Sequence, residues 1–158
     1  PVKLDDLVAN TLKELQINHG HVQVAIPANL PPAQADPRRL GQILHAVVEN
    51  ALRFSNDQPL EIAAAVEKAM AGGAMTLRLE VKDHGIGIPE EDLPHIFEMF
   101  YCASNNGEYK GAASNLAIAK RLLKLHKGDI LAESTPGEGA TFSLRLPVWQ
   151  EIEGMIRE

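Results

Sequence analysis

One stretch constrains the fold more than any other: an amphipathic helix that we expect from Asp36 to about Phe54. Asp36 is a good capping residue, and Pro37 suits a first turn, where its missing N–H is not needed. Apolar residues then recur every three or four positions, which is the spacing of one helical face. They are Leu40, Ile43, Leu44, Val47, Val48 and Ala51. Such a stripe must be buried against another layer of structure.

Shorter elements surround this helix. Helical spacing predicts further helices near residues 4–15 and 115–126. Alternating or β-rich runs predict strands near residues 21–26, 60–66, 75–82, 129–133 and 140–146, with turns at Gly72-Gly73 and at the PGEG sequence after Thr135. This order favours an α/β (α+β) fold with one layer of about three helices over a mixed, mostly antiparallel sheet of about five strands.

The pattern breaks down between Asp83 and Asn115, where glycines, prolines and short apolar pieces alternate. Compact domains seldom contain so long an irregular segment without a functional reason. We therefore expect residues 83–115 to form a loop and a lid over a binding site.

Composition excludes several classes of protein. The net charge of −6 argues against nucleic-acid binding, which needs a basic face. No apolar run reaches the roughly 20 residues of a membrane span, and the start does not resemble a signal peptide. A single cysteine, Cys102, cannot form an internal disulfide and suits a reducing cytosol. We expect residues 1–158 to form one cytoplasmic domain without direct membrane contact, with residues 148–158 as a tail.

Three separated segments carry side chains suited to a nucleotide site. On the long helix, Asn50 and Arg53 share a face with Ala46, and an amide oxygen and a cation there could meet Mg²⁺ and phosphate. Asp83 follows a strand and could accept a hydrogen bond from an exocyclic amine, while nearby glycines admit a flat ring. The helix start after Gly111 offers free N–H groups for phosphate oxygens. Each segment alone also fits an ordinary surface helix or turn.

Together the segments resemble the GHKL superfamily of ATPases, and in particular the catalytic domain of sensor histidine kinases. DPRRLGQILHAVVENALRFS is similar to the N box and DHGIGIP to the G1 box of that family. IFEMFY and GAASNLAIAK stand where the F and G2 boxes belong, and TPGEGATFSLRLP matches the closing turn and strand. The resemblance implies a two-layer α/β sandwich (the Bergerat fold) with a long ATP lid.

The resemblance also implies roles for individual residues. Asn50 would be the Mg²⁺ ligand, and Asp83 would bind the adenine amino group. The other nucleotide-binding residues would be Arg53, Phe54, Gly85, Gly87, Ile88, Lys110, Gly111, Leu116 and Thr141. The reaction would be phosphoryl transfer from Mg-ATP to a histidine on a separate helical dimerisation domain, so no catalytic residue is expected in this chain. A response regulator or another signalling protein would be a further partner.

The phosphate end of the site departs from the family pattern. Ala46 stands where the family has Asn or Glu, and Met99 and Cys102 replace basic F-box residues. Ala113 and Asn115 occupy G2 positions that are usually glycine, where positive φ disfavours alanine. Two hypotheses follow: a working but weakened kinase domain, or a degenerate domain that binds ATP weakly, ADP or nothing and acts as a regulatory protein-interaction module. The clamp ATPases of the same superfamily are a more distant alternative, because Ala46 removes their general-base position.

Overall fold

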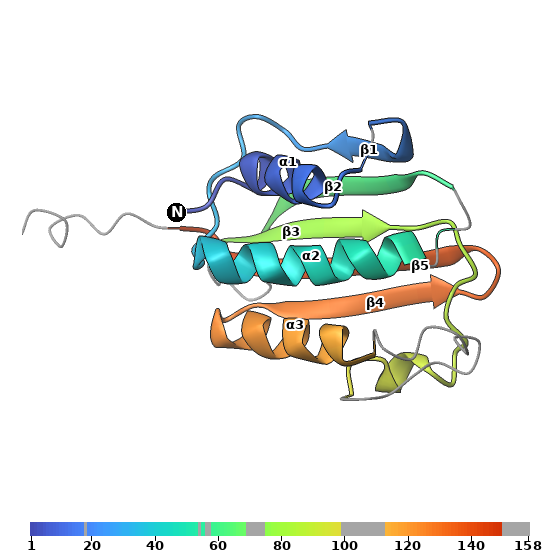
Figure 1. Ribbon diagram of the computed structural model, residues 1–158. Coiled ribbons are helices and arrows are strands. Elements are labelled where there is room, and N and C mark those ends of the chain that lie inside the picture. The colour runs from blue at the N-terminus through green and yellow to red at the C-terminus, as the bar shows by residue number, and fades with distance from the viewer. Residues whose placement is uncertain (18, 54, 56–57, 69–74, 99–112, 150–158) are drawn as a thin grey trace, which may run out of the picture.

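The computed structural model describes residues 1–17, 19–53, 55, 58–68, 75–98 and 113–149. These residues form an open sheet with helices on one face, as the sequence predicts (Figure 1). The helices are α1 (Leu4–Glu14), α2 (Pro37–Arg53) and α3 (Ala113–Leu125), with short 3₁₀ turns at His19–His21 and Leu93–His95. The strands are β1 (Val22–Ala25), β2 (Leu60–Lys68), β3 (Met75–Lys82), β4 (Asp129–Thr135) and β5 (Gly139–Pro147).

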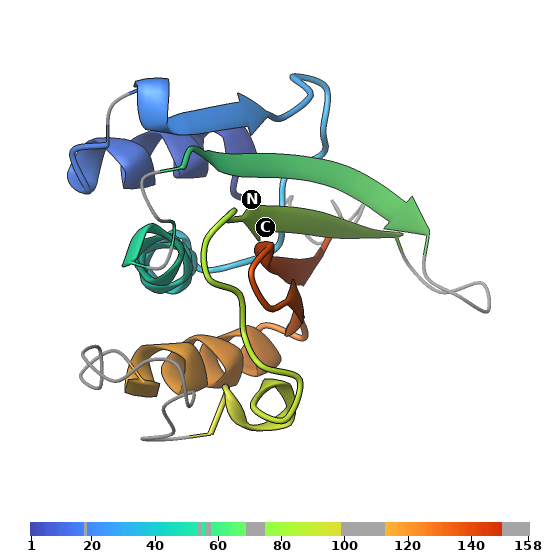
Figure 2. The same ribbon diagram turned by 90° about the vertical axis from the view of Figure 1, so that its right-hand side faces the viewer.

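The strand order in the sheet is β1-β2-β3-β5-β4. Only the β1–β2 pair is parallel, and the other pairs are antiparallel. Figure 2 shows α1, α2 and α3, which are labelled in Figure 1, on the same side of this sheet, so the fold has two layers. No helix in the described part of the chain is long and apolar enough to cross a membrane. The predicted two-layer sandwich is confirmed.

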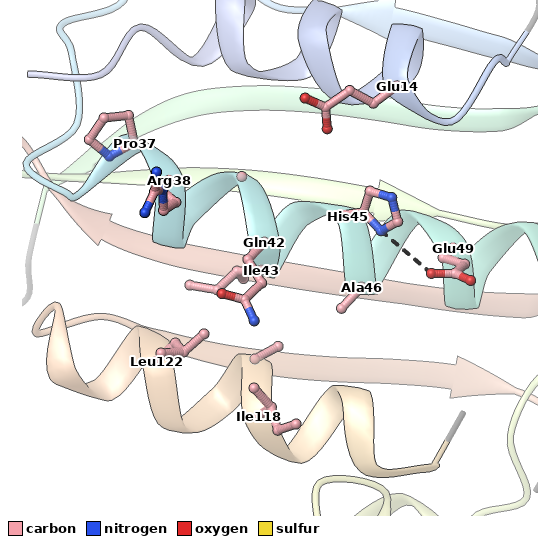
Figure 3. A pocket seen from close by; sticks show the side chains of 12 residues that line it. Glu14, Pro37, Arg38, Gln42, Ile43, His45, Ala46, Glu49, Ile118 and Leu122 are labelled. Carbon is pink, nitrogen blue, oxygen red and sulfur yellow. Dashed lines mark ion pairs between the residues drawn. The ribbon is translucent and has the colours of Figure 1, made fainter. Parts of the chain in front are cut away.

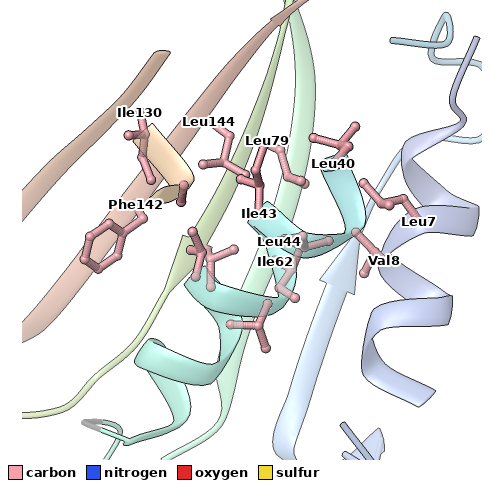
Figure 4. Close-up of a cluster of buried hydrophobic side chains, with 14 of the residues drawn as sticks. Leu7, Val8, Leu40, Ile43, Leu44, Ile62, Leu79, Ile130, Phe142 and Leu144 are labelled. Atoms are coloured by element: carbon pink, nitrogen blue, oxygen red, sulfur yellow. The ribbon is translucent and has the colours of Figure 1, made fainter. Parts of the chain in front are cut away.

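Helix α2 is the centre of the core, as its apolar stripe predicts. All six stripe residues, from Leu40 to Ala51, are buried. Figure 4 shows Leu40, Ile43 and Leu44 against side chains of the sheet, with Leu7 and Val8 of α1 alongside. Asp36 caps the helix, because its Oδ1 accepts hydrogen bonds from the N–H of Arg38 at 2.9 Å and of Arg39 at 3.4 Å.

Two sequence predictions are corrected by the structure. The strand predicted from His21 to Ile26 is present at Val22–Ala25, but the burial of its side chains does not alternate. Within β1 only Val22 is buried, and β1 is a short edge strand with a single neighbour. The last helix begins at Ala113 rather than Asn115. The predicted turn at Gly72-Gly73 and the tail beyond Trp149 lie outside the described residues.

The hairpin that joins β4 to β5 holds the loop that follows β3. The N–H of Gly137 donates to the carbonyl of Ile86 at 2.8 Å, and the N–H of Ile88 donates to Ser134 Oγ at 2.6 Å. Gly87 has a φ of 73°, and a Cβ there would overlap the carbonyl oxygen of Thr135. Gly139 has a φ of 104°, and a Cβ there would overlap the carbonyl oxygen of Asp83. Loop and hairpin therefore form one tightly packed unit.

This packing predicts different costs for two alanine substitutions in the same hairpin. Gly137 also has a positive φ of 84°, but in the described part of the chain a Cβ there would meet no atom within 4 Å. We expect Gly137→Ala to lower the free energy of unfolding by about 1 kcal/mol, from backbone strain alone. Gly139→Ala adds a backbone overlap and should cost about 3 kcal/mol or more. Urea denaturation of both variants measures this, and equal costs would contradict the proposed packing.

Candidate functional site

Four segments that are distant in sequence meet at one end of the sandwich. They are the end of β3, the β4–β5 hairpin, the last turns of α2 and the first turn of α3 (Figures 1 and 2). The three predicted site segments thus lie at the same end of the molecule. The loop from Asp83 onward leaves the sheet at this end and runs towards the 3₁₀ turn at Leu93–His95.

Asp83 is a carboxylate held inside the protein. Its residue is only 3% exposed, and its Oδ1 accepts hydrogen bonds from the N–H of Gly85 at 3.0 Å and of Ala140 at 3.3 Å. The backbone N–H of Asp83 donates to the carbonyl of Ala140 at 2.9 Å, so the two residues continue the pairing of the central strands β3 and β5 at their end. Burial raises the pKa of Asp83, and the two amide hydrogen bonds partly offset that rise.

In the described part of the chain, both hydrogen bonds to this side chain fall on Oδ1. An acceptor oxygen, Oδ2, is therefore left at the end of the core for a ligand. A carboxylate fixed in this way suits recognition of a neutral N–H donor. Folding has already removed water from the carboxylate, so ligand binding does not have to supply that desolvation free energy.

The predicted ligand face of α2 is not an open helix surface. Ala46, Asn50 and Arg53 are all half-buried, and α3 packs beside α2. A groove of about 500 Å³ runs between the two helices, and Ala46 and Glu49 line it together with Ile118 and Leu122 of α3 (Figure 3). The side chain that α2 directs into this groove at position 46 is only a methyl group.

Charged side chains form a row along the same helix. Glu49 Oε2 lies 3.5 Å from His45 Nδ1, the pair drawn in Figure 3, and Glu49 Oε1 lies 3.9 Å from Arg53 Nη2. Both are half-exposed i,i+4 contacts, which are weak.

The start of the predicted F box is anchored to the core. Ile96 is buried, and the ring of Phe97 meets Phe142 edge to face at a centroid distance of 6.3 Å. Lys120 Nζ lies 4.7 Å from the centre of the Phe97 ring and 3.6 Å from Asp129 Oδ1. These contacts fix the segment before residue 99, from which the predicted lid departs.

Not all predicted site residues come together. Gly85 and Gly87 are buried in the loop beside Asp83, and Ile88 packs partly against the core. Leu116 is buried in that core. Thr141 lies on the opposite face of the sheet from Asp83, since its strand neighbours Ala140 and Phe142 are the buried ones. Phe54, Lys110 and Gly111, together with Met99 and Cys102, lie outside the described residues, and the side chains of Ala113 and Asn115 are not described either.

Sequence reasoning missed three residues of the hairpin that support Asp83. Ala140 provides the second amide hydrogen bond, Gly139 provides the close approach, and Ser134 bonds to the loop. Strand alternation could have placed Ser134 and Ala140 on the buried face. Their contact with the loop depends on pairing between β3 and β5, which periodicity does not reveal.

The predicted metal ligand, Asn50, has the chemistry that nucleotide-bound Mg²⁺ requires. Mg²⁺ usually keeps several waters and binds proteins through one or two side-chain oxygens plus phosphates. One amide oxygen from Asn50 would satisfy that need. Among the described residues there is no group of three His, Cys, Asp or Glu side chains that could hold a metal without phosphate oxygens.

The raised pKa of Asp83 predicts how stability depends on pH. A carboxylate with a raised pKa contributes stability below its ordinary pKa and loses it as pH rises through the folded-state pKa. Asp83→Asn keeps an oxygen for both backbone amides but removes the buried charge. We expect this variant to unfold at higher urea than the wild type at pH 8, with the difference shrinking towards pH 4. Asp6→Asn, at the exposed start of α1, should instead lower stability slightly. A less stable Asp83→Asn variant at pH 8 would contradict this reading.

Comparison with known proteins shows the family of this chain. The sequence profile of histidine kinase-, DNA gyrase B- and HSP90-like ATPases matches residues 35–150. The chain is 34% identical over 154 residues to the adaptive-response sensory kinase SasA of Prochlorococcus marinus, covering 94% of this chain and 39% of SasA. It is 34% identical over 164 residues to the circadian input-output histidine kinase CikA of Synechococcus elongatus, covering 97% of this chain and 21% of CikA. The chain therefore spans well under half the length of these relatives.

Two solved structures share the fold. Full-length ShkA, in complex with AMPPNP, superposes with a TM-score of 0.76 at 27% identity, covering 96% of this chain and 31% of ShkA. The mycobacterial sensor histidine kinase MprB superposes with a TM-score of 0.74 at 19% identity, covering 95% of this chain and 99% of that structure. The chain belongs to the histidine kinase-, DNA gyrase B- and HSP90-like ATPase family, as an ATPase domain of the kind found in sensor histidine kinases.

Proposed function

We propose that this chain is the ATP-binding domain of a two-component sensor histidine kinase. It would hold Mg-ATP so that the γ-phosphate passes to a histidine on a helical dimerisation domain outside this chain, and from there to a response regulator. The observation that carries the proposal is the buried Asp83 carboxylate, fixed by two backbone amides at the end of the sheet. The sensor-kinase relatives and the AMPPNP complex of ShkA support it.

Asp83 would select adenine through its free carboxylate oxygen. Oδ2 accepts a hydrogen bond from the exocyclic amine of adenine, and this bond to a charged acceptor is stronger than a neutral one. A base with a carbonyl oxygen at the same position would place two acceptors against each other. Gly87 serves the base only indirectly, because its missing side chain lets the β4–β5 hairpin pack against the loop. Since the hairpin holds the loop, little ordering is needed when the base binds.

The last turns of α2 would hold the phosphates and their metal ion. The Asn50 amide oxygen would be the protein ligand of Mg²⁺, which neutralises phosphate charge during transfer. Arg53, one turn further on, would contact a phosphate through its guanidinium. Because such transfer relies mainly on positioning and charge neutralisation, each missing contact here should lower the rate. Since ATP is supplied inside the cell, the domain would work in the cytoplasm.

Calorimetric titration with ADP, with and without Mg²⁺, tests the two halves of this site separately. We expect micromolar binding by the wild-type chain. Asp83→Ala should weaken ADP binding by roughly 10- to 100-fold in either buffer, because the amine loses a charged partner. Asn50→Ala should weaken binding only in the presence of Mg²⁺, because its role requires the metal.

Asn10→Ala on the exposed face of α1 is the matched control and should bind as the wild type does. No detectable binding of ADP or ATP by the wild-type chain would sink the proposal. Equal losses for Asn50→Ala with and without Mg²⁺ would remove the assigned metal role.

One observation favours a second function, that of a non-catalytic regulatory module on the same fold. Ala46 places only a methyl group in the groove, one helical turn before Asn50. The family resemblance places a polar residue there. A domain that has lost this contact could retain adenine recognition and bind ADP or ATP without transferring phosphate, while contacting another signalling protein.

Restoring the missing side chain distinguishes the two functions. If the site is only weakened, Ala46→Asn should tighten Mg-ATP binding by roughly 10-fold, because the amide adds a hydrogen bond to a charged group. It should also increase histidine phosphorylation in the full-length protein. Asn10→Ala, on the exposed face of α1, is again the control and should change neither. A variant with tighter binding but no phosphorylation would favour the regulatory module, and unchanged binding would rule out Ala46 as the eroded contact.

A further inference from the structure

We infer that Ser134 is a positioning residue for base recognition: its hydroxyl fixes the loop that carries Asp83, and with it the preference for adenine. The inference rests on the proposed function. It concerns a residue on β4 that has no place among the nucleotide-binding residues considered above. Ser134 does not touch the Asp83 carboxylate, so it would act through the backbone that it holds.

The Ser134 hydroxyl connects two backbone segments. It accepts a hydrogen bond from the N–H of Ile88 at 2.6 Å and donates one to the carbonyl of Gly139 at 2.8 Å. Ile88 lies five residues after Asp83 in the loop that follows β3, and Gly139 begins β5. One hydroxyl thus connects the loop at Ile88 to the start of strand β5 at Gly139.

The same strand segment holds the near end of the loop. The residue after Gly139 is Ala140, whose N–H donates to Asp83 Oδ1 at 3.3 Å. Gly139 itself lies so close to the Asp83 carbonyl that a side chain would overlap it. The loop is therefore fixed at Asp83 by Ala140 and at Ile88 by Ser134. A shift of either end would move the carboxylate oxygen relative to the base.

Only a side chain with both a donor and an acceptor on a short stem can make this connection. Serine and threonine hydroxyls have one donor and two lone pairs, and the strand leaves the side chain half-buried beside the loop. In Ser134→Ala, the Ile88 N–H and the Gly139 carbonyl both lose their hydrogen bond to the hydroxyl. A partly buried N–H without a partner is costly, so the loop should relax away from the strand.

Competition between ADP and IDP measures the proposed role, because IDP differs from ADP at the exocyclic amine that Asp83 would read. Calorimetry should show wild-type binding that favours ADP. Ser134→Ala should weaken ADP binding by roughly 10-fold and IDP binding much less, so that the preference falls. Ser134→Thr, which keeps the hydroxyl, should restore both values. Ser143→Ala, on the other face of the same hairpin, is the matched control and should leave them unchanged.

Each alternative outcome is decisive. If Ser134→Ala binds ADP and IDP with the wild-type affinities and preference, the inference is overturned. Equal losses of affinity for ADP and IDP would also overturn it, because they indicate a merely structural residue. If the wild-type chain binds neither nucleotide, the proposed function fails, and amide hydrogen exchange then judges the positioning role alone. Faster exchange at Ile88 and Gly85 in Ser134→Ala, but not in Ser143→Ala, would support that role, and unchanged exchange would contradict it.

Discussion

The arrangement at the end of the sheet depends on accommodating one carboxyl side chain inside the protein. Asp83 is almost fully buried, and burial raises its pKa, so its charged form is tolerated only with hydrogen bonds to compensate. The backbone N–H groups of Gly85 and Ala140 supply them. The first requires the chain to turn sharply after β3, and the second requires β5 to begin directly beside that turn. Much of the local sequence is explained by these two requirements.

Glycine and serine in the hairpin serve the same requirement. Gly139 allows the hairpin backbone to contact the backbone of Asp83, and Gly87 allows the loop to pack against the carbonyl of Thr135. The Ser134 hydroxyl forms hydrogen bonds with Ile88 of the loop and Gly139 of the hairpin. In the proposed function, the base end of the site is built on the ends of two central strands of the sheet. The phosphate end would instead use the face of α2 that borders the groove beside α3. A substitution at Ala46 would change that face without disturbing the sheet. The proposed site could therefore lose phosphate contacts and keep its adenine end.

The sequence predicted the helix layer well and the site only in part. Each residue of the α2 stripe, from Leu40 to Ala51, is buried as its spacing indicates, because a long amphipathic helix has few ways to hide one face. The resemblance to histidine kinases then singled out Asp83. It did not show that Thr141 faces away from Asp83, because the face of a strand residue depends on register. Nor did it show that Ala46 lines a groove shared with α3, because a helix face predicts which side is polar but not what packs nearby.

Base exchange at Asp83 tests most directly the claim that this carboxylate reads the exocyclic amine of adenine. In Asp83→Asn the side-chain amide can donate where the carboxylate could only accept, so the preferred base should change. The affinities of wild type and Asp83→Asn for ADP and IDP can be measured by calorimetry under identical conditions. The account predicts that the wild type prefers ADP and that Asp83→Asn loses or reverses this preference. The same preference in both proteins would show that another group selects the base, and it would contradict the central role given to Asp83.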